Sequence, residues 1–311
     1  MLRANQAVRL GLRAASRNPE FAFGRALLDQ AGNLLAFLPV LLAVVLVFGG
    51  TSSLLQALAA VRLLGWPTLG ALTAAAALAF AAGMVFWSGA LPLLAADAEM
   101  DRRPPSGNFA PLASRGFART LLAGLLGAAL SSGFALACLA ALVSAAPAAV
   151  ARPSPTLMAG VALIATVAIA AGVLFDLLGR LLLVRAAAFG EGLTAAFGKA
   201  VSLLGARLGA LLVVSVAFLV LELIAASVAG MLTSVITTTA LLDWNAELLA
   251  LWPRLAAGLA FAAVFAWLEV GRMGALCALA LDAEGLIESP PLPQAAPLAE
   301  PVIEALPIDE P

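Results

Sequence analysis

The stretch Trp267-Leu-Glu-Val-Gly271-Arg272, inside the last long apolar run, decides how the chain is interpreted. The same order of an aromatic residue, a short run and a glycine occurs twice before it. The earlier copies are Phe86-Trp-Ser-Gly89 and Phe175-Asp-Leu-Leu-Gly179-Arg180, and the glycines lie 90 and 92 residues apart. An acidic side chain follows every copy (Glu99, Glu191, and Asp282 with Glu284). This recurrence predicts one unit used three times.

Composition indicates an integral membrane protein. Hydrophobic residues make up 63% of the 311 residues and charged residues only 11%, with a mean hydropathy of +1.06. Soluble domains are about 45–50% apolar and about 25% charged. A spanning helix needs about 20 apolar residues, and the apolar runs predict six spans. They cover approximately residues 34–50, 68–94, 118–146, 156–182, 208–236 and 254–281.

The expected fold is therefore all-α and polytopic, with six transmembrane helices in three tandem helical-hairpin repeats and interfacial amphipathic helices. A basic interfacial helix on the cytoplasmic side occupies residues 1–33, and the transmembrane domain occupies residues 34–281. The repeats cover approximately 20–100, 101–190 and 191–285.

Residues 1–33 carry five arginines ahead of any long apolar run. A cleavable signal peptide has a shorter basic region followed at once by its apolar core. Pro19 followed by Glu20 indicates a helix start, and Arg25 and Asp29 are spaced for an i,i+4 ion pair. We expect an interfacial helix that leads into the first span.

Basic residues are concentrated in alternate loops. Segments 1–33, 97–119 and 180–207 hold five, four and four of them. The positive-inside rule then places both termini in the cytoplasm, in agreement with an even number of spans in a bacterial inner membrane. The opposite loops hold one arginine each (Arg62, Arg152 and Arg254).

Two of the basic segments, 106–119 and 191–207, precede the second and third hairpins. In the later one Leu193, Phe197 and Val201 recur at helical spacing. These segments are either amphipathic helices at the inner membrane surface or simple connections between hairpins.

Residues 282–311 differ in composition from the rest of the chain. They contain seven prolines, seven acidic residues and no basic residue. Such a segment cannot bury enough apolar surface to offset its chain entropy, so we expect a disordered acidic, Pro-rich cytoplasmic tail. The sequence Pro290-Pro-Leu-Pro293 makes the tail either a docking segment for a protein partner or a plain solvated extension.

Glu222 is the candidate site for an ion, a proton or a polar contact between helices, because it lies near the middle of the fifth predicted span. An ionisable residue inside a bilayer is costly and often functional. Three states are open to this carboxyl group. It is protonated, it faces a wet cavity, or it pairs with a basic side chain from another helix.

Two further acids have a basic residue close by on the same predicted helix. Asp176 and Arg180 are spaced i,i+4, and Glu269 and Arg272 are spaced i,i+3. Such pairs neutralise themselves along one helix face, so we interpret them as structural intrahelical pairs. The first unit lacks the pair, with Ala90 where the others have arginine.

Signals for catalysis are absent from the sequence. There is no histidine, and no nucleophile elbow, zinc-protease or phosphate-loop motif occurs. The two cysteines, Cys138 and Cys277, lie inside apolar runs without ligand spacing. We therefore expect no enzyme activity, no cofactor, no metal and no nucleic-acid partner.

The segment after the fourth span carries a family resemblance. Its pattern is Arg180, an apolar run, Glu191-Gly, Ala196, Lys199-Ala, Leu203-Leu and Arg207. It resembles the bacterial membrane-domain family found fused to some glycerophosphodiester phosphodiesterases, together with its stand-alone six-helix relatives. The resemblance implies an envelope protein linked to lipid or membrane homeostasis. It implies no catalytic residues, because none belong to the membrane part of that family.

Two functions follow from these features. We expect a non-enzymatic scaffold or accessory subunit that contacts the bilayer and a protein partner, the latter through 282–311. The alternative is a small transporter or channel that uses Glu222. A homo-oligomer is compatible with either.

Overall fold

The computed structural model describes residues 2–48, 65–100, 108–151, 155–241 and 246–287. These ranges are all-α and contain seven helices. They are α1 (Ala4–Arg17), α2 (Pro19–Phe48), α4 (Trp66–Met100), α5 (Phe109–Ala151), α6 (Pro155–Ala188), α7 (Leu193–Leu241) and α8 (Ala246–Ala283).

Five helices among the described residues are long and apolar enough to cross a bilayer, so the chain is a multi-pass membrane protein. The stretches are Leu69–Met100, Phe109–Ala141, Met158–Ala188, Leu193–Ile236 and Trp252–Ala283. Each of the last five predicted spans lies inside one of the helices α4 to α8. The first predicted span, 34–50, falls on the second half of α2, and its last two residues lie outside the described ranges.

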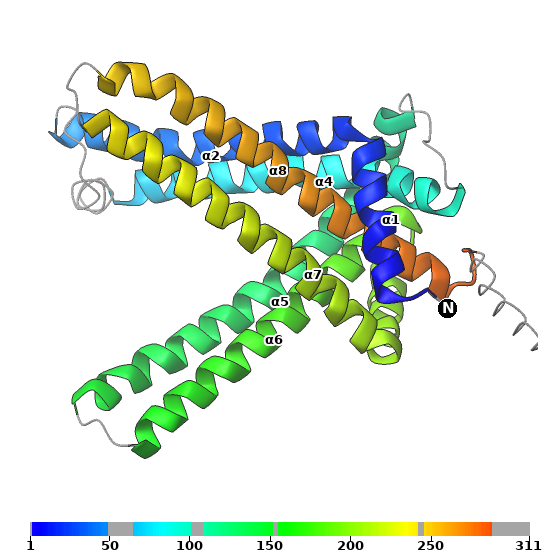
Figure 1. The fold of residues 1–311 in the computed structure, drawn as a ribbon. Coiled ribbons are helices and arrows are strands. Elements are labelled where there is room, and N and C mark those ends of the chain that lie inside the picture. Colours follow the sequence, from blue (N-terminus) through cyan, green and yellow to red (C-terminus); the bar gives the residue numbers. More distant parts are fainter. Residues whose placement is uncertain (1, 49–64, 101–107, 152–154, 242–245, 288–311) are drawn as a thin grey trace, which may run out of the picture.

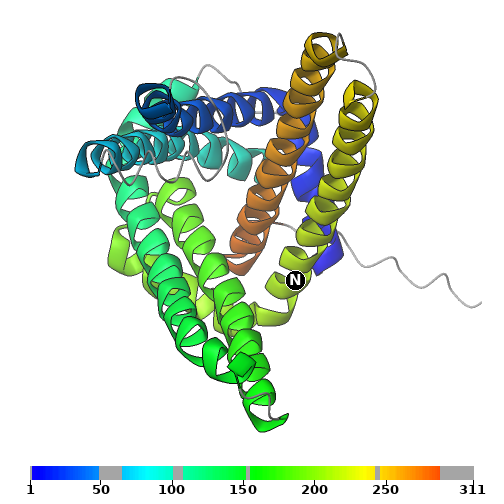
Figure 2. The same cartoon turned by 90° about the vertical axis from the view of Figure 1, so that its left-hand side faces the viewer.

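The long helices pack as three pairs, α2 with α4, α5 with α6, and α7 with α8. The pairs meet at one end of the molecule and separate toward the other (Figures 1 and 2). We call the meeting region the hub and define it as α1 with residues 84–97, 177–187 and 266–282. The remaining lengths of the three pairs are called the arms.

The hub holds the hydrophobic core. Leu91, Leu181 and Leu276 are fully buried there, together with most of their neighbours. The arms expose their large apolar side chains, among them Ile169 and Met231. Lipid has to cover these arm surfaces unless another protein does, because water cannot solvate them favourably.

The repeated glycine of each unit lies in close contact with another helix. A Cβ atom on Gly127 of α5 would lie 2.9 Å from the Cα atom of Gly179 on α6. A Cβ atom on Gly89 would lie 2.7 Å from the ring of Phe109. Gly271 has its carbonyl oxygen against Gly11 of α1. Small residues allow such close backbone approach in membranes, which gives the repeated pattern a packing role.

The N-terminal segment forms two helices, where one interfacial helix leading into the first span was expected. α1 crosses α8 and buries small residues against it, including Ala7, Gly11 and Ala14. Asn18 separates it from α2, which starts at Pro19 as predicted. The predicted Arg25–Asp29 pair is also confirmed, with 3.0 Å between Arg25 Nη2 and Asp29 Oδ1.

Helix α7 changes direction at Arg207, whose φ and ψ of −132° and 29° are not helical. This residue is the last of the amphipathic segment predicted over 191–207, so the boundary before the fifth span is visible in the backbone.

The predicted start of the tail at residue 282 was too early. α8 continues to Ala283, and Asp282 accepts a hydrogen bond of 2.8 Å from the backbone N–H of Leu2. The acidic composition alone could not reveal that these first residues have basic and backbone partners in the hub. Residues 288–311 lie outside the described ranges.

The close approach of α5 and α6 predicts that Gly127→Ala destabilises the protein. The added methyl group would overlap the Gly179 backbone, and overpacking costs about 1–3 kcal/mol. Gly133→Ala on the same helix meets open space, so it should gain about 0.5–1 kcal/mol from helix propensity. Thermal unfolding in detergent measures both. A Gly127→Ala protein that melts at or above the wild-type temperature would contradict this packing.

Candidate functional site

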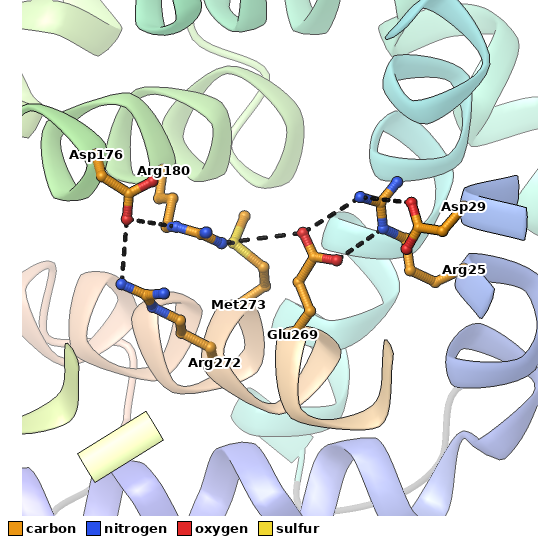
Figure 3. A network of polar contacts seen from close by, with 7 residues as sticks. All are labelled: Arg25, Asp29, Asp176, Arg180, Glu269, Arg272 and Met273. Carbon is orange, nitrogen blue, oxygen red and sulfur yellow. Dashed lines mark hydrogen bonds and ion pairs between the residues drawn. The ribbon is translucent and has the colours of Figure 1, made fainter. Parts of the chain in front are cut away.

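A line of charged side chains links the three helix pairs where the arms join the hub (Figure 3). Positive and negative groups alternate along it. We call it the ionic chain and define it by seven residues. In order they are Asp29, Arg25, Glu269, Arg180, Asp176, Arg272 and Glu222.

The first part of the ionic chain joins α2 to α8. Arg25 donates from Nε to Glu269 Oε2 at 2.8 Å, in addition to its contact with Asp29. The Arg25 guanidinium also lies 5.7 Å from the ring centroid of Trp87 on α4, within the range of a cation–π contact. One arginine therefore contacts two other helices, α4 and α8, besides forming the i,i+4 pair on its own helix.

The second part joins α8 to α6 and returns to α8. Arg180 Nη1 lies 4.0 Å from Glu269 Oε1, and Arg180 Nε donates to Asp176 Oδ2 at 2.9 Å. The same oxygen of Asp176 accepts from Arg272 Nη2 at 3.1 Å. Asp176 thus bridges two arginines that come from different helix pairs.

Glu222 ends the chain on α7. Its carboxyl group interacts electrostatically with the Arg272 guanidinium on α8. The three states that the sequence leaves open for Glu222 stay predictions.

Of the two intrahelical pairs predicted from the sequence, one forms as expected and the other does not. Asp176 and Arg180 contact each other along α6, as their spacing indicates. Glu269 and Arg272 take their partners from other helices instead of from each other, because positions three apart on a helix diverge by about 60° around its axis. Glu269 is directed to α2 and α6, and Arg272 to Asp176 (Figure 3). A pair expected to close on itself therefore connects the three helix pairs.

The ionic chain borders a cavity of about 280 Å³. Arg25, Asp29, Arg180 and Glu269 line it, with Trp87 among the apolar lining residues. The contact between Arg180 and Glu269 measures 4.0 Å, longer than the 3.1 Å contact between Arg272 and Asp176 that also joins α6 to α8. This cavity therefore lies beside the weakest link between α6 and α8.

Two carboxylates of the ionic chain remain accessible. The side chains of Asp29 and Asp176 are 41% and 43% exposed, although Asp176 belongs to a stretch long enough to span a bilayer. A charged group facing hydrocarbon is costly. Water or another polar group must therefore lie next to the Asp176 carboxylate in the membrane.

A second group of charges closes the opposite side of the hub. We call it the loop cluster, and it consists of Arg185, Glu191, Lys199, Arg207, Asp282 and Glu284. Arg185 Nη1 donates to Glu284 Oε1 at 2.5 Å, and Lys199 Nζ donates to Glu191 Oε1 at 2.7 Å. Arg207, at the change of direction in α7, donates to Asp282.

Two acids, Asp97 and Glu99, follow the glycine of the first repeated unit, and their environments differ. Glu99 is exposed, whereas Asp97 is only 2% exposed and pairs with Arg17 of α1 at 3.5 Å. Spacing from the glycine could not distinguish two acids that are two residues apart and therefore lie on roughly opposite faces of the helix. Comparing which of the two acids lies on the apolar face of the helix would have identified Asp97 as the buried one.

No group of three or more histidine, cysteine or acidic side chains suited to a metal ion occurs among the described residues. Comparison of the chain with protein-family models, curated proteins and solved structures finds no match. The fold and the ionic chain together define a multi-pass helical membrane protein held by charges between its helix pairs. Its resemblance to the membrane-domain family stays a prediction.

The central position of Glu269 predicts that Glu269→Gln weakens the contact between α2 and α8. The substitution removes a charged acceptor of Arg25, and such hydrogen bonds contribute about 1.5–3 kcal/mol. Thermal unfolding in detergent should show a loss of about 2 kcal/mol, while Glu99→Gln at the exposed position leaves the melting temperature unchanged. Equal effects from the two variants would contradict the central role of Glu269.

The loop cluster predicts a pH-dependent contribution to stability. The hydrogen bond from Arg185 holds the pKa of Glu284 below its ordinary value of 4.5. A lowered pKa in the folded state stabilises the protein above the ordinary value, and this contribution disappears as pH falls through the lowered pKa. Glu284→Gln should therefore melt below wild type at pH 7, and the difference should vanish on acidification below pH 4.5. A difference that is constant with pH would contradict the pairing.

Proposed function

We propose that the protein is a non-enzymatic scaffold or accessory subunit of a complex in a bacterial cytoplasmic membrane, with the arms as its partner-binding surface. The proposed arrangement has six spans in three hairpin repeats and both termini in the cytoplasm. The observation that carries the proposal is the separation of the three helix pairs beyond the hub (Figure 2).

The exposure of the arms supports this function. Ile169 of α6 and Met231 of α7 are 70% and 71% exposed, and other large apolar residues along the arms are similar. Membrane helices of another protein can pack against these exposed apolar faces. Close packing of such helices gives van der Waals contact that disordered lipid chains supply less well.

The ionic chain supports a structural role for the charges. Its acids and arginines are compensated by each other across the described helices. A rigid hub held in this way keeps the arms at fixed angles. A scaffold requires that property, because partner helices bind best to a surface that is already in position.

The repeated units support the hairpin arrangement. Each pair contains one copy of the glycine pattern on its second helix, at Gly89, Gly179 and Gly271, and each copy makes a close contact in the hub. The α2–α4 pair includes the first predicted span, which gives the sixth membrane crossing of the proposal.

Site-specific photo-crosslinking in the native membrane tests the scaffold. A photoreactive amino acid at Ile169 or Met231 should give a discrete adduct with one protein, identified by mass spectrometry. The same group at Ser114, exposed on α5 beside the hub, is the matched control and should give none. Adducts with lipid alone at both arm positions would contradict the scaffold function.

The tail can be tested in the same experiment. Deletion of 288–311 leaves Asp282 and Glu284 in place, whereas deletion from residue 282 would also remove their ion pairs with the hub. Loss of the adduct in the shorter deletion would place the partner contact in the tail as well as in the arms.

The second candidate function is a small transporter or channel. The cavity of about 280 Å³ beside the ionic chain favours it, as do the two accessible carboxylates. In such a protein Glu222 would exchange between Arg272 and a bound cation or proton. Flux through proteoliposomes separates the functions, because Glu222→Gln would abolish carrier activity but leave the crosslinked adduct of a scaffold unchanged.

A further inference from the structure

A pocket of about 270 Å³ lies between α6, α7 and the end of α8. Three basic residues of the loop cluster line it, namely Arg185, Lys199 and Arg207. Ser202 adds a hydroxyl group, and Glu284 is the acidic lining residue. The charged side chains that line the pocket are therefore three basic ones and one acidic one.

Arg185 is the fixed part of this pocket. Its side chain is only 3% exposed, and the guanidinium lies 4.7 Å from the ring centroid of Phe189. Its Nη1 atom contacts Glu284 and Glu191, at 2.5 and 3.7 Å, while its Nε atom is buried without a hydrogen-bond acceptor. The hydrogen-bonding capacity of this buried guanidinium is thus not exhausted by its acidic neighbours.

The other lining groups are adaptable. Lys199 is 49% exposed, and its ammonium group lies 2.7 Å from Glu191 and 3.4 Å from Glu284. Glu284 follows Ala283, the last residue of α8, and precedes Gly285, whose φ is 72°. Glu284 can leave Arg185 without unwinding the helix, because it lies beyond the helix end.

A phosphate group matches this set of donors. A guanidinium presents several N–H donors in a plane, which suits the oxygens of phosphate, and an ammonium adds a compact positive charge. A phosphate with two or more free oxygens would replace the single Glu284 carboxylate between Arg185 and Lys199. The volume of about 270 Å³ leaves room for the group attached to the phosphate.

The position of the pocket agrees with this ligand. It adjoins the hub on the side that the arginine distribution predicts to be cytoplasmic. Basic pockets between transmembrane helices on that side bind phosphate-bearing lipid headgroups.

We propose that Arg185, Lys199, Ser202 and Arg207 form a binding site for a phosphate monoester, which displaces Glu284. The phosphate belongs to an anionic phospholipid headgroup or to a soluble ligand. Binding would replace the contact of Glu284 with Arg185, while Ile287 stays packed against the hydrophobic core. This site is separate from the ionic chain and does not depend on the scaffold function.

Titration of the full-length protein in neutral detergent tests the site. The probes are inorganic phosphate and short-chain phosphatidic acid, with short-chain phosphatidylcholine as the lipid control, at constant ionic strength and read by calorimetry. Saturable binding of either phosphate probe is expected. Response to phosphate identifies a soluble ligand, and response to phosphatidic acid alone identifies a headgroup.

Variants of the exposed lysine make the test specific. Lys199→Gln should weaken binding about tenfold or more, as expected for loss of a charge-assisted hydrogen bond. Lys199→Arg should retain binding, and Arg9→Gln, which alters an exposed arginine on α1, should leave it unchanged. No saturable binding of either phosphate probe would overturn the proposal, as would equal binding by Lys199→Gln and wild type or equal affinity for phosphatidylcholine.

Discussion

The contact between Arg25 and Glu269 is the interaction on which the arrangement of the helix pairs depends. It joins α2 to α8 at 2.8 Å, and its two side chains are only 19% and 25% exposed. In such surroundings neither charge is tolerated alone, so each fixes the position of the other. Every further member of the ionic chain extends this constraint, and the two ends of the chain lie on α2 and α7. Movement of one pair against another would leave a charge without its partner.

Small residues provide the second constraint, and it acts in the same region. Gly127 with Gly179, and Gly11 with Gly271, bring backbones close enough that a methyl group has no room. Packing of this kind is short-ranged and tolerates little sliding, whereas ion pairs act over longer distances. The charges therefore select which helices meet, and the glycines determine how closely they meet.

The sequence was sufficient for the local features of this fold. Apolar runs located the long helices, Pro19 located the start of α2, and Arg25 with Asp29 formed the expected pair. These features depend on residues within a few turns of one another. The partners of Glu269 and Arg272 could not be predicted, because they come from α2 and α6 and depend on how the pairs are rotated. The ordered position of Asp282 was missed for the same reason, since its partners are Arg207 and the N-terminal Leu2.

The ionic chain contains four acids and three arginines, so it carries one surplus negative charge if every group is ionised. Its two accessible carboxylates, Asp29 and Asp176, are where an additional positive or polar group can approach. In a carrier, water and a transported cation would supply that group. In a scaffold, a basic side chain on a partner helix would do so, at the point where the arms diverge. Both functions thus impose the same physical requirement. Water, a cation or a polar side chain must lie next to these carboxylates. A partner helix that carries lysine or arginine at this depth would meet the requirement and fill the apolar space around it.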